Sequence, residues 1–135
     1  MKRFFYCVVM ALSGLAFSGC KDSVVEHRAK VEAQWKIQVH GFLQGDRAAF
    51  ESVLSASSKA QPEKADQTFA AVNGLAVILR TTEADVRVEN VSFNKEFTQA
   101  IVTAAHKATN EPGGWKAFPN PETWVREKGR WLRQL

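Results

Sequence analysis

Three histidines are the residues of this chain whose chemistry best suits proton transfer. His40 stands next to the apolar residues of an amphipathic segment, and His106 lies in an apolar run that alternates. Either one could project into a pocket as a general base, but no carboxylate is placed beside either, and Ser-His-Asp, HExxH and glycine-loop patterns are absent from the sequence. His27, His40 and His106 are too scattered for a zinc site. We therefore expect no catalytic residue, no metal and no cofactor.

Aromatic side chains are the stronger candidates for a binding site. Ligand pockets are concave and rich in apolar and aromatic residues, so Trp35, Trp124 and Trp131 are candidates for a pocket lining, although Trp35 also fits a core position. Trp115 and Phe118 lie in a loop rich in glycine and proline. There they form either a plug over a pocket or a recognition patch for a partner, and both interpretations stay open.

The first twenty residues indicate a secreted protein. Lys2 and Arg3 precede an almost uncharged apolar run over 4–17, which is too short to span a bilayer and ends in small residues. Phe17-Ser18-Gly19-Cys20 resembles the bacterial lipobox, with phenylalanine in place of the usual leucine. In that family the cysteine is acylated and the leader is cut before it. The alternative is ordinary cleavage after Ser18, which would give a soluble periplasmic protein.

The lipobox resemblance implies the domain organisation and the location of the chain. It implies a signal peptide over 1–19, a lipidated Cys20 with a short tether over 20–23, and one domain over 24–135. The protein is then held by palmitate-like chains in the bacterial cell envelope and faces the periplasm. Lys21 after the cysteine resembles the outer-membrane signal, because aspartate there specifies the inner membrane.

Composition excludes several classes of protein. Of 18 basic residues two belong to the leader, and the rest nearly balance 14 acidic ones, so nucleic acid is not an expected partner. Cys7 leaves with the leader and Cys20 carries lipid, so the domain has no disulfide. The chain of 135 residues, less its leader, suffices for one domain and not for two.

Helical periodicity dominates the first half of the domain. A long amphipathic helix is predicted over 24–44 and ends at Gly45-Asp46, where aspartate can cap a second helix over 47–56. A polar connection over 55–61 leads to a third helix from Pro62. Gly74 in that helix predicts close packing. The residues expected to face the core are Val24, Val31, Trp35, Val39, Phe42, Leu43, Phe50, Val53, Leu54, Ala65, Phe69, Val72, Ala76 and Leu79.

From residue 85 the apolar period changes to two, which indicates strands. The parity of the apolar residues switches between Val88 and Val91, so a bulge is expected near Glu89-Asn90. Asn94-Lys95 is predicted as a tight turn into a strand over 96–109, which is apolar on both faces and therefore central.

The remainder of the chain is predicted to be a loop followed by a hairpin. The loop covers 110–121, and the hairpin strands cover 122–127 and 130–134 around the turn Lys128-Gly129. This turn places Trp124 and Trp131 diagonally on one face, each beside an arginine in stacking geometry. The expected cross-strand pairs are Glu127 with Arg130, Arg126 with Trp131, Val125 with Leu132 and Trp124 with Arg133.

Helices followed by a curved antiparallel sheet resemble the NTF2-like, or SnoaL-like, cone fold. The resemblance rests on the Gly45-Asp46 junction, on the bulged strand and on the closing hairpin Trp124–Leu132, and it covers 24–135. The expected class is α+β, an NTF2-like or cystatin-like cone with N-terminal helices packed on the sheet. The resemblance implies a pocket between sheet and first helix. It implies no activity, because the fold serves enzymes, binding modules and assembly subunits.

These observations predict a membrane-anchored periplasmic lipoprotein that binds a protein partner or a small apolar ligand without catalysis. The alternatives are a SnoaL-like hydrolase or isomerase that uses His40 or His106, and an accessory subunit of an envelope assembly that docks through Trp115. The lipid anchor makes the membrane a partner, and a homodimer stays open.

Overall fold

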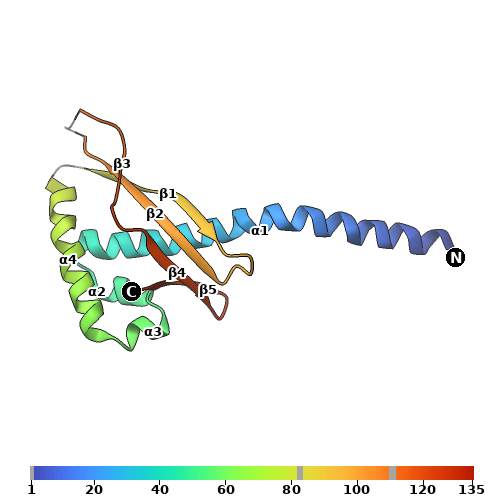
Figure 1. Ribbon diagram of the computed structural model, residues 1–135, viewed down its shortest axis with the longest axis horizontal. Coiled ribbons are helices and arrows are strands. Elements are labelled where there is room, and N and C mark those ends of the chain that lie inside the picture. Colours follow the sequence, from blue (N-terminus) through green and yellow to red (C-terminus); the bar gives the residue numbers. More distant parts are fainter. Residues whose placement is uncertain (1, 82–83, 110–111) are drawn as a thin grey trace.

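One long helix runs through the whole molecule, and the remaining elements gather around its C-terminal half. The computed structural model describes the backbone of residues 2–81, 84–109 and 112–135, with side chains from residue 23 onward (Figure 1). The elements are α1 (Lys2–Gln44), α2 (Arg47–Ser52), α3 (Ala56–Lys59), α4 (Pro62–Thr81), β1 (Asp85–Phe93), β2 (Gln99–Lys107), β3 (Lys116–Ala117), β4 (Glu122–Glu127) and β5 (Arg130–Gln134).

α1 begins much earlier than the predicted start at residue 24. It begins at Lys2, and its N-terminal half extends away from the other elements (Figure 1). The stretch 20–23, predicted to be a tether, is therefore helical, which is consistent with the absence of proline before Pro62. Val24, predicted to face the core, is 45% exposed. Removal of the leader stays a prediction.

The junction after α1 forms as the sequence predicts. Gly45 adopts a left-handed conformation with φ of 67°, and Asp46 Oδ1 accepts a hydrogen bond from the backbone N–H of Ala49 at 3.1 Å. α2 ends at Ser52, earlier than predicted. The supposed polar connection contains α3, because Ser55 caps it by accepting a hydrogen bond from the Ser58 N–H at 3.2 Å.

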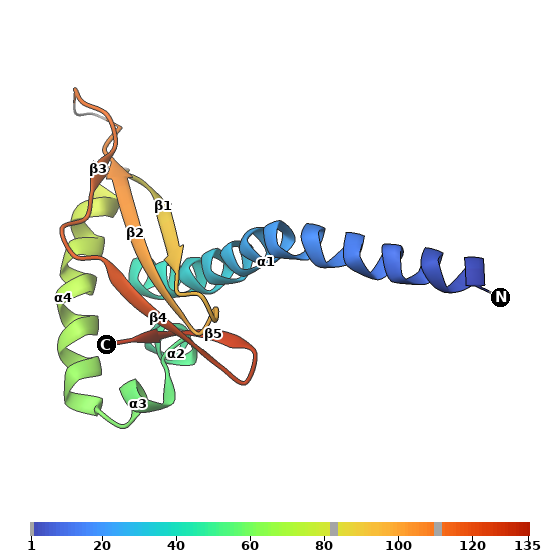
Figure 2. The same cartoon turned by 45° about the vertical axis from the view of Figure 1, so that its right-hand side comes forward.

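α4 begins at Pro62 as predicted and crosses the C-terminal end of α1 (Figures 1 and 2). Arg80 fixes this crossing by donating to the carbonyl oxygen of Leu43 at 2.7 Å. The prediction of close packing at Gly74 is wrong, since apart from its chain neighbours and the adjacent backbone of α4, no atom of the described residues lies within 4 Å of the position a Cβ would take. Gly74 is on the exposed face of the helix.

The sheet is antiparallel, in the order β1-β2-β4-β5, with short β3 paired to β2. The predicted bulge is confirmed, because the register between β1 and β2 shifts between Val88 and Asn90. The predicted tight turn is longer: Asn94 Oδ1 accepts from the N–H groups of Thr98 and Gln99, so β2 begins at residue 99. β2 is central as predicted, but Ile101 is 37% exposed, because none of the described helices covers the outer face of the sheet (Figure 2).

The terminal hairpin confirms the predicted register at every pair from Glu127–Arg130 to Trp124–Arg133. Trp124 and Trp131 share the inner face and are fully buried. Each is paired with an arginine as predicted, but in the described part of the chain no guanidinium lies over either indole ring. The indole N–H groups donate hydrogen bonds, Trp124 to Glu122 and Trp131 to His27. The loop predicted over 110–121 contains β3, and its first two residues lie outside the described ones.

Two apolar clusters build the core. One lies between α1 and the inner face of the sheet, and it includes Val31, Trp35, Trp124 and Trp131. The other joins α1, α2 and α4 through aromatic rings, with the centroids of Phe42 and Phe50 5.0 Å apart. Burial of each such side chain contributes about 2 kcal/mol. The clusters hold α4 beside one end of the sheet and leave a space between them.

Candidate ligand-binding cavity

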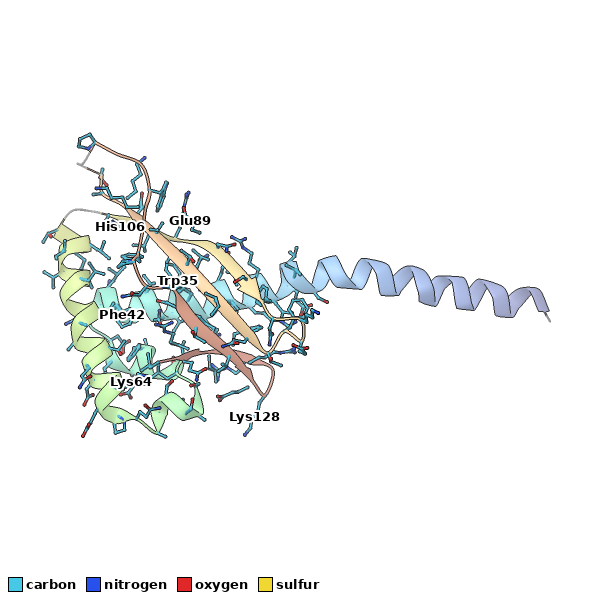
Figure 3. All side chains as sticks on the ribbon, in the orientation of Figure 1. Trp35, Phe42, Lys64, Glu89, His106 and Lys128 are labelled. Carbon is cyan, nitrogen blue, oxygen red and sulfur yellow. The ribbon has the colours of Figure 1, made fainter. Side chains whose placement is uncertain are left out.

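A cavity of about 330 Å³ lies between α1, α4 and the inner face of the sheet. Its volume is at the lower end of the range for small-molecule sites, which is about 300–1,000 Å³. Trp35 and Phe42, both labelled in Figure 3, belong to its α1 side. The lining residues are Trp35, Gln38, Val39, Phe42, Leu43, Thr68, Val72, Leu75, Ala76, Leu79, Val86, Ala104, Phe118, Pro119, Asn120, Glu122 and Arg133.

Helical spacing and small side chains explain why space remains here. Val72, Ala76 and Leu79 recur every three or four residues on α4 and so face the cavity together. Ala76 and Ala104 approach from opposite sides, on α4 and β2, and both are buried. Two alanines at facing positions do not fill the gap that larger side chains would close. The walls are accordingly apolar over most of their area.

One end of the cavity is polar and is organised around the carboxylate of Glu122 at the start of β4. Gln38 Nε2 donates to both Glu122 oxygens at 3.1 Å. The Trp124 indole N–H donates to Oε2 at 3.0 Å. Arg133 on β5 completes the group, with its Nη1 3.7 Å from the same oxygen. Three elements thus bring one anion, one cation and one amide to a single point.

Arg133 is held rigidly by its backbone. It pairs with Trp124 in the hairpin, and on its other side it forms a bridge to Leu54, with its N–H donating to the Val53 carbonyl at 2.7 Å. Its side chain is only 16% exposed. Burial lowers the pKa of the Arg133 guanidinium, and the charge of Glu122 partly opposes that effect. The guanidinium nevertheless stays a cation, since arginine is effectively always protonated in proteins.

Two polar atoms of this group have no hydrogen-bond partner among the described residues. They are Gln38 Oε1 and Arg133 Nη1, and both are buried. Gln38 itself is 1% exposed. Buried polar groups almost always have hydrogen-bond partners in folded proteins. These two unpaired atoms therefore mark the polar end of the cavity as a place where a ligand could form hydrogen bonds.

The residues predicted as site candidates divide between the cavity and other places. Trp35 and Phe118 line the cavity, and Trp124 touches its polar end through Glu122. His40 is exposed on α1 and outside the cavity lining. The side chain of Cys20 lies outside the described ones.

Three further candidates lie elsewhere. The rings of Trp131 and His27 pack edge to face, with their centroids 5.7 Å apart. His106, labelled in Figure 3, packs against Phe118 with the rings 4.9 Å apart but is not in the lining of the large cavity. Trp115 lies under the Arg87 guanidinium, 3.9 Å from its ring centroid. Arg87 points to the outer face, since its neighbours Val86 and Val88 pack on the core.

Sequence reasoning did not find Gln38, Glu122 or Arg133. A signal existed for Gln38, because it continues the buried stripe Val31–Trp35 at helical spacing, where a polar side chain is unusual. Glu122 and Arg133 carry no comparable signal. Their meeting depends on how the hairpin packs against α1, which is a tertiary feature.

Neither a metal centre nor a membrane span is found in the part of the chain that the structure describes. It contains no group of three or more His, Cys, Asp or Glu side chains that could hold a metal ion. Its helices include none that is both long and apolar enough to cross a bilayer.

Comparison with known proteins shows the fold. A Campylobacter jejuni protein, described as an NTF2-like transpeptidase, matches at a TM-score of 0.55 over 73% of this chain and 91% of its own, with 15% identity. The intermembrane space region of chloroplast protein ARC6 covers 84% of this chain and 92% of its own at 13% identity, but its TM-score of 0.34 is too low to indicate a shared fold. No protein-family model matches, and no curated protein is significantly similar in sequence. The chain has the α+β NTF2-like cone fold.

Proposed function

We propose that this protein is a lipid-anchored periplasmic protein of the bacterial envelope that binds a small, mostly apolar ligand without catalysis. The observation that carries the proposal is the cavity of about 330 Å³ between α1, α4 and the sheet. Apolar walls with a few convergent polar groups are typical of a small-molecule site. The cavity lies where the NTF2-like fold leads one to expect a pocket, between the first helix and the sheet.

The composition of the cavity lining argues against catalysis. Transpeptidase chemistry, named in the description of the Campylobacter protein, needs an activated nucleophile. Among the described lining residues Thr68 is the sole hydroxyl or thiol, and no histidine accompanies it. His40 and His106, the bases expected for a SnoaL-like enzyme, are not lining residues. Glutamine at both positions should therefore leave the cellular function of the protein intact.

A blocking substitution tests ligand binding directly. Ala104 is buried on β2 at the wall of the cavity, so Ala104→Leu should fill part of the space that a ligand occupies. We expect calorimetric titration with the neutral probe 2-heptanone to show binding to the wild-type chain and little or none to this variant. Ala33→Leu, exposed on α1, is the matched control and should bind normally. Equal binding by all three proteins would place the probe outside the cavity and contradict the proposal.

The anchor is proposed from the lipobox at Phe17–Cys20. Each buried acyl methylene contributes about 0.8 kcal/mol, so several chains hold a protein permanently at the membrane. Mass spectrometry of the protein from bacterial membranes should find an acylated N-terminal Cys20. Cys20→Ser should release the domain into the periplasm or leave the leader uncut. An unmodified N-terminus at Gly19, after cleavage behind Ser18, would support the soluble alternative.

A second candidate function, docking onto an envelope protein, is favoured by the position of Trp115. This residue lies outside the cavity, half-buried under Arg87 on the outer face of the sheet, and tryptophan is enriched among the residues that dominate protein contacts. Trp115→Ala should abolish crosslinking to a partner in intact cells while thermal unfolding stays unchanged. A crosslink to a second copy of the chain would identify a homodimer, and an unchanged crosslinking pattern would count against this surface.

A further inference from the structure

The polar end of the cavity contains one unused acceptor and one unused donor. The acceptor is Gln38 Oε1 and the donor is an N–H of Arg133 Nη1. Both residues line the cavity. Both also contact the Glu122 carboxylate, Gln38 at 3.1 Å and Arg133 at 3.7 Å, so the two unused atoms belong to one small region.

The orientation of the Gln38 amide is fixed by its partner. Its nitrogen faces both oxygens of Glu122, and turning the amide over would put its oxygen against a carboxylate. The oxygen is thus the group left without a partner, and its side chain is almost completely buried at 1% exposure. Leaving a buried acceptor without a hydrogen bond is unfavourable, so the Gln38 oxygen favours ligands that can donate a hydrogen bond to it.

From this arrangement we infer that the ligand carries an uncharged head group with an adjacent hydrogen-bond donor and acceptor, such as an amide or a protonated carboxylic acid, on a short apolar body. This inference rests on the proposed function of the cavity. Both atoms have almost no accessible surface, so a ligand reaches them when the two side chains shift slightly toward the cavity. The donor of the head group then meets Gln38 Oε1, and its acceptor meets Arg133 Nη1. The apolar body lies along Val72 and Phe118.

Charge at the site disfavours ionised head groups. Glu122 and Arg133 already form a neutral pair. A carboxylate ligand would satisfy Arg133 but would lack a donor for Gln38 and would lie beside the Glu122 anion. An ammonium ligand would lack an acceptor for Arg133 and would lie beside its cation. Like charges that meet in a poorly solvated site repel strongly.

Cavity volume sets the size of the ligand. At about 30 Å³ for each water-sized group, a volume of about 330 Å³ accommodates roughly ten non-hydrogen atoms. Hexanamide and 2-heptanone are suitable probes, because they have the same shape and differ only in an amide NH₂ in place of a methyl group. The ketone is the more hydrophobic of the two and would bind more tightly to a cavity that offers only apolar contact.

The test is calorimetric titration of the full chain in lipid nanodiscs, with the signal of empty nanodiscs subtracted. We expect hexanamide to bind about fivefold more tightly than 2-heptanone, because one net hydrogen bond is worth about that factor. Hexanoate at pH 7 should bind more weakly than hexanamide. If both neutral probes bind and the ketone is equal or better, the head-group inference is wrong and the proposed cavity function survives. If neither neutral probe binds, both proposals fail.

A substitution at Gln38 tests whether the preference for hexanamide over 2-heptanone depends on the acceptor Oε1. Gln38→Met keeps a side chain of similar length and removes Oε1, so it should lower the affinity for hexanamide about fivefold and leave that for 2-heptanone within twofold. An unchanged preference for the amide in this variant would overturn the role of Gln38. If the variant does not fold, the order of hexanamide and 2-heptanone on the wild-type chain still decides.

Discussion

Glu122→Gln tests whether Glu122 and Arg133 form a buried charge pair at the polar end of the cavity. The substitution keeps the size of the side chain and an oxygen that can accept from the Trp124 indole, but it removes the charge opposite Arg133. Glu89→Gln on β1 is a natural control. Its carboxylate lies 3.9 Å from Arg87, close to the 3.7 Å between Glu122 and Arg133.

The two pairs differ in burial, and this difference sets the expected magnitudes. The side chains of Arg133 and Glu122 are 16% and 21% exposed, against 49% and 42% for Arg87 and Glu89. At such separations the attraction is about 4 kcal/mol where the effective dielectric constant is near 20 and about 1 kcal/mol in water. Loss of one partner of a fully buried pair costs about 3–5 kcal/mol. Because the pair at the cavity is partly exposed, we expect Glu122→Gln to lower the free energy of unfolding by about 2 kcal/mol.

Urea denaturation followed by tryptophan fluorescence measures the difference. Glu89→Gln should change the free energy of unfolding by less than about 0.5 kcal/mol, as exposed pairs do. A salt titration adds a second readout, because the exposed pair is screened more strongly than the buried one. Equal losses in the two variants, or a loss at Glu122 that disappears at high salt, would refute the assignment of a buried charge pair to the cavity.

Two further predictions concern other parts of the fold. Gly41→Ala should destabilise the protein, since the added Cβ would lie 2.9 Å from the backbone nitrogen of Phe50. Gly74→Ala should raise the free energy of unfolding by about 0.5–1 kcal/mol, because no other described element approaches that position. Chemical denaturation compares the two variants, and a stabilised Gly41→Ala would contradict the close packing of α1 against α2. His27 accepts a hydrogen bond from the Trp131 indole N–H at 3.2 Å. Burial, and then the charges of Arg126 and Lys30, lower the pKa of the His27 imidazole below the ordinary 6.5. The stability linked to this shift is therefore complete above about pH 6.5 and is lost as the pH falls through the lower pKa of the folded state. In the wild-type chain the urea midpoint of unfolding should fall between pH 7 and pH 5, and His27→Gln should reduce this pH dependence. A wild-type midpoint that does not fall over this range would exclude a contribution of His27 to the pH dependence of stability.

Local patterns predict the elements of this fold well. The helix end at Gly45-Asp46, the start of α4 at Pro62, the bulge near Glu89 and the hairpin register all depend on residues close in sequence. Where local signals compete, the predictions were less accurate. Ser55 caps an extra short helix, α3, in a stretch that composition suggested was a loop.

Tertiary arrangement explains what the sequence did not show. Gly74 was predicted to pack closely, but α4 contacts α1 through another face, and no other described element approaches the Gly74 Cβ position. Trp124 and Trp131 were placed correctly on one face, yet their hydrogen-bond partners come from Glu122 and from His27, the latter 104 residues away in the chain. The polar end of the cavity has the same origin, since Gln38 and Glu122 are 84 residues apart.

A crystal structure of the protein soaked with hexanamide tests the central claim most directly. The account predicts electron density for the probe in the cavity between α1, α4 and β2, with its apolar chain against Trp35 and Phe118 and its amide beside Glu122. A cavity that stays empty at saturating hexanamide, or density for the probe only on the outer surface, would contradict the assignment of this space as a ligand site.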